Sequence, residues 1–92
     1  MTEFRNAEGQ PISEADALAA PLQQDFSLEW DDDKIAYCSR VADEQWAVRV
    51  RMNGAYYPRG SVTRTAHMFK PNDGIHRPEE SFSAAVRKLI EH

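Results

Sequence analysis

The 92 residues carry 41% hydrophobic and 28% charged side chains, which is the composition of a single small globular domain. No apolar run is long enough for a membrane helix, and the segment from Met1 to Phe4 is too polar to open a signal peptide. The lone Cys38 excludes an internal disulfide and a cysteine-based zinc cage, and it suits a reducing compartment. We therefore expect one cytoplasmic domain over residues 1–92, with an irregular N-terminal arm over residues 1–11.

The formal net charge of −4 is distributed unevenly along the chain. Residues 1–33 hold nine acids and one base, a net charge of −8, whereas residues 34–92 hold ten bases and six acids, a net charge of +4. Such a split predicts an acidic surface and a basic surface that could meet different partners. The alternative is that the two halves neutralise each other within one fold.

A short helix is expected after residue 12. Ser13 followed by Asp16 resembles a capping box, with aspartate in place of the usual glutamate, and Pro21 ends the helical run. A helix of about two turns is not stable alone in water, so it must pack against the rest of the domain.

Alternating apolar residues then predict four antiparallel strands. The first alternation is Phe26, Leu28 and Trp30, which is typical of a strand with one buried face. Asn53-Gly54 is a strong hairpin signal, because a type I′ turn needs positive φ at both positions. Pro58 confines the last strand to an edge or a bulge. The strands are expected at residues 26–30, 35–38 and 46–52, with a fourth that begins at Ala55.

The lengths of the turns predict how these strands pair. A turn at 31–34 pairs residue 30 with 35, a turn around 42–43 pairs 40 with 45, and Asn53-Gly54 pairs 52 with 55. These registers place nine large side chains on one face, which we expect to be buried. They are Phe26, Leu28, Trp30, Ile35, Tyr37, Trp46, Val48, Val50 and Tyr57.

Residues 61–77 show only a weak alternation of apolar and polar side chains and contain residues typical of loops. A helix is expected after Pro78, with an apolar stripe that begins at Phe82 and continues to Ile90. The sequence therefore predicts an α+β fold: an antiparallel four-stranded β-meander with a C-terminal helix packed on one face and a short N-terminal helix.

No catalytic or metal-binding pattern stands out. Asp31-Asp32-Asp33 lacks the spacing of a calcium loop, and Cys38, His67 and His76 match no zinc cage. The chain contains no phosphate-binding glycine loop and no nucleophile elbow. We predict a protein that is not an enzyme, with no cofactor and no metal.

The sheet face opposite the core is the candidate binding surface. The registers place Arg49, Arg51 and Tyr56 there, beside Ala36 and Cys38. Arginine binds phosphates and tyrosine stacks on bases, which is how sheet surfaces hold single-stranded nucleic acid. The alternative is that the N-terminal helix covers this face and pairs its acids with the arginines. With the basic segment that follows, the candidate partner-binding or nucleic-acid-binding residues are Arg49, Arg51, Tyr56, Arg59, Arg64, Lys70 and Arg77.

The chain resembles type I-F anti-CRISPR proteins in three respects. It is short and acidic, its expected elements run in the order helix–meander–helix, and two of its segments are similar. The segments are residues 53–60, which read NGAYYPRG, and residues 69–74, which read FKPNDG. The resemblance implies a bacteriophage inhibitor in the host cytoplasm. Such an inhibitor binds subunits of a crRNA-guided CRISPR–Cas surveillance complex, with the crRNA backbone as a further candidate partner, and blocks target DNA hybridisation by occupancy. It implies no membrane and no small-molecule substrate.

Two other classes stay open at this point. One is a small regulatory module that binds RNA or single-stranded DNA on its own, and the other is an accessory or structural phage protein without nucleic-acid contacts. Whether the acidic N-terminal third or the arginine-rich segment is the main binding surface also stays open.

Overall fold

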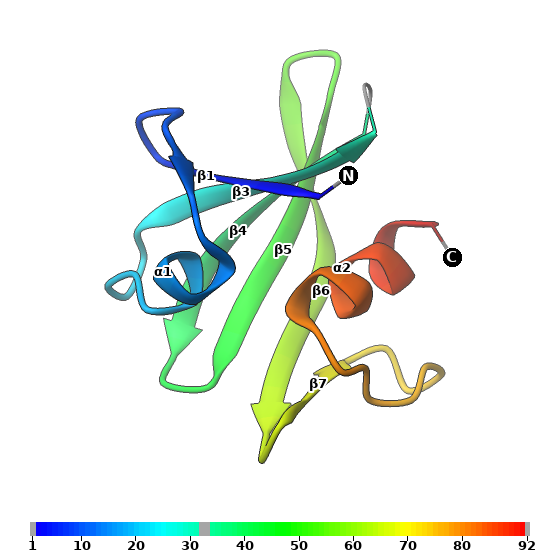
Figure 1. Cartoon of the computed structure of the whole chain (residues 1–92). Helices are drawn as coiled ribbons and strands as arrows, with labels where there is room; N and C mark the ends of the chain where they lie inside the picture. The colour runs from blue at the N-terminus through cyan, green and yellow to red at the C-terminus, as the bar shows by residue number, and fades with distance from the viewer. Residues whose placement is uncertain (1, 32–33, 92) are drawn as a thin grey trace.

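A computed structural model describes residues 2–31 and 34–91 and has an α+β fold (Figure 1). One curled antiparallel sheet of seven strands, in the order β2-β1-β3-β4-β5-β6-β7, carries both helices on one face. The elements are β1 (Glu3–Asn6), β2 (Pro11–Ile12), α1 (Glu14–Leu18), β3 (Asp25–Asp31), β4 (Lys34–Ala42), β5 (Gln45–Met52), β6 (Ala55–Thr65), β7 (Met68–Pro71) and α2 (Phe82–Glu91).

The predicted fold class is correct, but the predicted count of four strands is wrong. Residues 1–11, expected to be irregular, contribute β1 and the start of β2. The Asn6 side chain closes this hairpin, because its oxygen accepts hydrogen bonds from the backbone N–H groups of Glu8 and Gln10, both at 2.9 Å. β1 buries Phe4 alone among its side chains, and one buried residue makes no visible alternation in a sequence.

The third unexpected strand follows from a β-bulge in β6. Pro58 pairs with Arg49 and Gly60 pairs with Val48, so that Arg59 is the extra residue on the β6 side. The bulge allows β6 to continue through proline and glycine to Thr65, where the chain turns back into β7. A proline and a glycine two residues apart are normally strand terminators, so the sequence pattern did not show the continuation.

The side chains of strand β4 lie on the opposite faces of the sheet from those predicted. Bulges between Glu29 and Asp31 and between Arg40 and Ala42 shift its pairing by one residue with each neighbour. A shift of one residue turns every side chain over, so Ala36 and Cys38 lie in the core, while the predicted core residues Ile35 and Tyr37 do not. The two shifts compensate each other, and β5 therefore keeps its predicted face.

The core is built around the first residue of α2. The Phe82 ring is fully buried and lies 5.5–6.4 Å from the ring centroids of Phe4, Phe26, Trp46 and Phe69. These rings come from β1, β3, β5 and β7, so one side chain connects elements along the whole chain. Aromatic pairs at these separations are stabilising beyond the area that they bury.

Both helix starts have side-chain caps. Ser13 accepts a hydrogen bond from the Asp16 N–H at 3.1 Å, as the capping pattern predicts. The second helix begins later than the expected start at Pro78, because Ser81 caps it by accepting from the Ala84 N–H at 3.2 Å. Glu79 directly follows Pro78 and would lie in the first turn of the expected helix, but it forms a β-bridge with Phe69 instead.

The bulge in β6 also fixes the end of α2. The Arg59 guanidinium donates hydrogen bonds to the carbonyl oxygens of Leu89 at 3.2 Å and Ile90 at 3.4 Å. A cation at this end of a helix also complements the helix dipole. Gly60, with φ of 122°, lets the backbone lie against Leu89, since an added Cβ would sit 3.3 Å from a Leu89 methyl group.

Replacing Gly60 by alanine should therefore destabilise the protein by about 1–3 kcal/mol, because the new Cβ is strained at this φ and crowds Leu89. Gly9→Ala is the matched control, since Gly9 also has positive φ, 84°, but its Cβ would meet open space. Urea denaturation of the two variants measures the difference. Equal losses would mean that the contact with Leu89 contributes nothing.

Candidate binding surface

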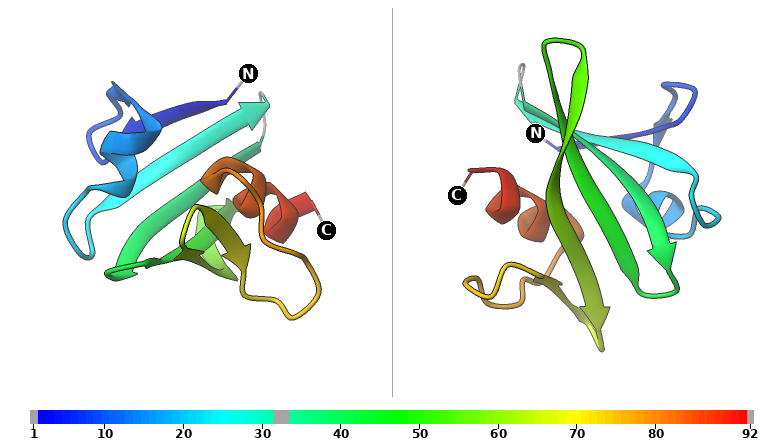
Figure 2. Two further views of the ribbon diagram at one scale, coloured as in Figure 1. Left: turned by 60° about the horizontal axis from the view of Figure 1, so that its bottom comes forward. Right: turned by 180° about the vertical axis from the view of Figure 1, so that it is seen from behind.

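No helix of residues 2–31 and 34–91 covers the sheet face that carries Arg49 and Arg51. The alternative in which the N-terminal helix lies over the arginines is wrong, because Ala17 and Leu18 of α1 belong to the buried core. Seen from behind in Figure 2, the strands β3 to β6 face the viewer and both helices lie on the far side. The two helices therefore leave this face open to a partner.

Four side chains on this face form a cluster that we call the Arg–Tyr patch: Tyr37, Arg49, Arg51 and Tyr56. Tyr37 pairs with Arg49 across β4 and β5, and Arg51 pairs with Tyr56 across β5 and β6. Directly paired residues share a face, and so do residues two apart on one strand, which brings all four together.

Tyr56 is the centre of the Arg–Tyr patch. The guanidinium carbons of Arg49 and Arg51 lie 5.4 and 5.8 Å from its ring centroid, within the range of a cation–π interaction. The Tyr37 ring packs edge-on against the same ring at 5.2 Å and 89°. The Tyr56 ring therefore holds two cations in defined positions while half of its surface stays exposed.

The two arginines differ in how much charge they offer. Arg49 forms an ion pair with Asp25 at 3.2 Å, and its side chain is one-third exposed. Within residues 2–31 and 34–91, Arg51 has no ion pair, and it lies at the protruding end of the β5–β6 hairpin. The pairing of β4 with β5 ends at Tyr37 and Arg49, so residues 50–57 form a hairpin end that protrudes without pairing to β4 (Figure 1).

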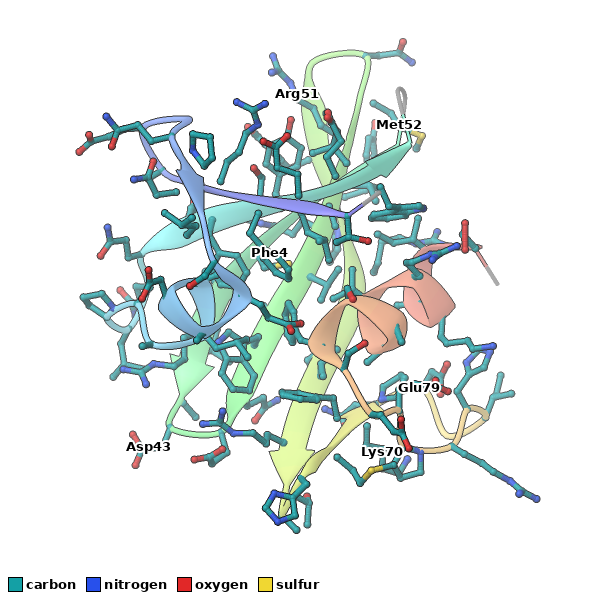
Figure 3. The ribbon with its side chains drawn as sticks, viewed as in Figure 1. Phe4, Asp43, Arg51, Met52, Lys70 and Glu79 are labelled. Atoms are coloured by element: carbon teal, nitrogen blue, oxygen red, sulfur yellow. The ribbon has the colours of Figure 1, made fainter. Side chains whose placement is uncertain are left out.

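The structure separates the other four candidate residues from the Arg–Tyr patch. Arg59 binds the end of α2, and Arg64 forms an ion pair with Glu44 while its guanidinium lies 5.2 Å from the Trp46 ring centroid. That contact is on the helix side of the sheet, since Trp46 is a core residue. Lys70 on β7 and Arg77 in the following loop are exposed, and Figure 3 shows Lys70 at the opposite end of the molecule from Arg51.

Two residues of this surface were not identified from the sequence. Tyr37 was predicted to be buried, and Asp25 was not connected with the arginines. The signal for Tyr37 was present in its neighbours: small Ala36 and Cys38 suit a tightly packed sheet interior, and cysteine is among the most frequently buried residues. Asp25 has no local signal, because its ion pair with Arg49 depends on the register of three strands.

The described residues contain no group of three or more His, Cys, Asp or Glu side chains that could hold a metal ion. Cys38 is fully buried, and burial raises the pKa of its thiol far above the usual value, which leaves it unreactive in the folded protein. Of the aspartate run, Asp32 and Asp33 lie outside the described residues. No helix in the described part of the chain is long and apolar enough to span a membrane.

Asp73 and His76 form a separate polar pair in the loop before α2. The Asp73 carboxylate accepts hydrogen bonds from the backbone N–H groups of His76 at 3.0 Å and Ile75 at 2.9 Å, and it contacts the His76 Nδ1 at 2.5 Å. These donors favour the charged carboxylate and hold the pKa of Asp73 well below its usual value.

A lowered pKa means that Asp73 stabilises the fold above its ordinary pKa of about 3.9, and that this contribution is lost as the pH falls toward the lowered value. Asp73→Asn should therefore have a lower melting temperature than the wild type at pH 7. The difference should shrink below about pH 4. Thermal unfolding at several pH values measures it, and a difference that stays constant down to pH 3 would contradict the role of the charge.

Comparison with known proteins gives no relative: no family model matches the chain, and no curated protein or solved structure matches it either. A function must therefore be inferred from the surface itself.

Proposed function

We propose that this chain is a bacteriophage inhibitor of the type I-F anti-CRISPR kind. It binds a crRNA-guided CRISPR–Cas surveillance complex in the host cytoplasm and blocks target DNA hybridisation by occupancy, without catalysis or a cofactor. The observation that carries the proposal is the Arg–Tyr patch, in which Tyr56 holds two guanidinium groups on an uncovered sheet face.

The composition of this surface suits a tight interface. Tyrosine and arginine are the residue types that most often dominate binding energy between proteins. A guanidinium group binds a phosphate or a carboxylate through two parallel hydrogen bonds, so crRNA phosphates and acidic protein side chains are both suitable partners. Because the arginines are already positioned by Tyr56, less side-chain entropy is lost on binding.

The hairpin end adds apolar surface beside the arginines. Met52 and Tyr57 are 54% and 45% exposed, and they alternate with Arg51 and Tyr56 along the two strands. A protruding hairpin with cations on one side and apolar side chains on the other can enter a cleft and contact both walls. Such a shape suits a protein that occupies a groove in a large complex.

The second candidate is an autonomous module that binds RNA or single-stranded DNA, and two tyrosines on an open sheet favour it. Two features oppose it. The Tyr56 ring is already in contact with two guanidinium groups and the edge of Tyr37, so a base would have to compete for it. A net charge of −4 also disfavours binding to free nucleic acid.

Binding to a purified type I-F surveillance complex, compared with binding to the free guide RNA, separates the two candidates. The inhibitor should bind the complex, prevent target DNA hybridisation and bind the free RNA weakly. A module of the second kind should bind free RNA with an affinity that falls steeply as salt increases. Salt-sensitive binding to free RNA, with no effect on the complex, would replace the first proposal by the second.

A further inference from the structure

The open face of the sheet, opposite the helices, carries different charges on its two sides. On β1 and β3, the residues that alternate with buried side chains are Glu3, Arg5, Asp25, Ser27 and Glu29. On β5 and β6, this face carries the Arg–Tyr patch with Arg49 and Arg51. In the described part of the chain, the β1–β3 side therefore has a negative net charge and the β5–β6 side a positive one.

Two charges on this face lack a counter-ion. Glu29 and Arg51 form no ion pair within the part of the chain that the structure describes. Arg49 reaches Asp25 across β4, but Arg51 lies beyond the last pair of β4 and β5. Glu29 is also paired directly with Glu3, and like charges in such positions are destabilising. A cation from another molecule would offset this repulsion.

Apolar side chains of β4 lie between the two charged sides. Ile35 and Tyr37 are half-buried and point away from the core. Ile35 pairs with Glu29 on β3. Tyr37 pairs with Arg49 on β5, so Arg51, two residues further along β5, belongs to the row of Ile35. Glu29, Ile35 and Arg51 therefore follow one another across the sheet, with the acid on one side and the base on the other.

A second copy of this face is complementary to the first. When two such sheets face each other with a two-fold axis along β4, β3 of one protomer lies opposite β5 of its partner. The row is then reversed: Arg51 of each protomer meets Glu29 of the other, and the two Ile35 side chains meet at the centre. Sheets commonly pack face to face with nearly aligned strands. An apolar centre flanked by complementary charges is typical of protein interfaces.

We propose that the open face binds a second copy of this chain, in a symmetric dimer held by two reciprocal ion pairs between Arg51 and Glu29. Ile35 and Tyr37 form the apolar centre of the interface. The dimer covers Arg51, so the Arg–Tyr patch can bind another partner only after the two copies separate. This dimer forms from the chain alone and does not depend on the inhibitor function proposed above.

Sedimentation equilibrium of the wild-type protein measures the association. At an ionic strength of about 0.05 M, the protein should dimerise with a Kd of about 100 µM or below. The Kd should rise as added salt screens the two ion pairs. A Kd above about 100 µM at this low ionic strength would overturn the proposal.

Charge reversal tests the two ion pairs. Arg51→Glu places two carboxylates at each contact and Glu29→Arg places two guanidinium groups there, so each variant alone should dimerise at least about tenfold more weakly, or 1.4 kcal/mol. An equimolar mixture of the two variants restores opposite charges at both contacts in the mixed dimer. Its Kd should lie within about threefold of the wild-type value. Lys88→Glu makes the same change of charge as Arg51→Glu at an exposed position of α2, on the helix side, and should leave the Kd unchanged.

Circular dichroism of each variant shows that the fold is kept, and recovery in the mixture excludes misfolding as the cause of a weaker dimer. A Kd unaffected by either reversal would mean that the copies associate through another face. A mixture that associates no more tightly than its components would refute the contact between Arg51 and Glu29. Failure of the protein to inhibit a surveillance complex would change none of these results.

Discussion

Replacing Phe82 by alanine should destabilise the protein by about 3–5 kcal/mol, which is most of the stability expected for a domain of this size. The side chain is fully buried and contacts four aromatic rings from four strands. Its removal leaves a cavity, and the four rigid rings that contact it collapse poorly into such a space. Urea denaturation followed by circular dichroism measures the loss.

Tyr57→Ala is the control for this prediction. The sequence pattern placed Tyr57 in the same core, but it is 45% exposed at the end of the β5–β6 hairpin. We expect it to change the free energy of unfolding by less than about 1 kcal/mol. A loss for Tyr57→Ala as large as that for Phe82→Ala would show that the hairpin end is packed against the core in solution.

Under the proposed inhibitor function, replacing both Arg49 and Arg51 by alanine should weaken binding to the surveillance complex at least about tenfold, or 1.4 kcal/mol. Truncation of one partner in a desolvated charge pair often costs about 2–5 kcal/mol, so tenfold is a lower bound for two such groups. The fold should survive, because the one ion pair that is lost, between Arg49 and Asp25, is partly exposed and contributes little to stability. Titration of each variant against the purified complex, with displacement of target DNA as the signal, gives the comparison.

The matched control is the double variant Lys70→Ala and Arg77→Ala. It removes the same charge from exposed positions outside the Arg–Tyr patch. We expect it to weaken binding by less than about threefold, as for rim charges that remain in water. If the Lys70 and Arg77 variant lost more affinity than the Arg49 and Arg51 variant, the binding surface would lie around β7 instead of the open sheet face.

The parts of the fold that could be predicted from the sequence are those fixed by local chemistry. Asn53-Gly54 determines its own turn type, and the register of Val50 with Tyr57 follows from it. The hairpins at either end of β4 have bulges instead, one at Trp30 and one at Val41. Whether a turn is tight or bulged depends on the twist of the completed sheet, which is not encoded in the few residues of the turn.

The candidate site also has parts that the local sequence predicts and parts that depend on the completed sheet. Arg49, Arg51 and Tyr56 lie in one hairpin, so alternation alone brought them together. Arg59 and Arg64 follow in the same strand, but the bulge at Arg59 turns them toward α2 and Trp46. The pairs that complete the site, Tyr37 with Tyr56 and Asp25 with Arg49, join strands through long-range registers that no local pattern specifies.

Because Cys38 is buried, the reactivity of its thiol reports how often the folded protein opens. It lies in the middle of β4 with its side chain in the core, so a water-soluble alkylating reagent reaches it only when the core on the helix side of the sheet opens. Local fraying of the strand ends does not expose a central position of this kind, and the rate of labelling should follow the rarest, most global fluctuations of the molecule. One cysteine therefore lets the opening free energy of the sheet be measured without any engineered probe, in isolation or with a partner bound.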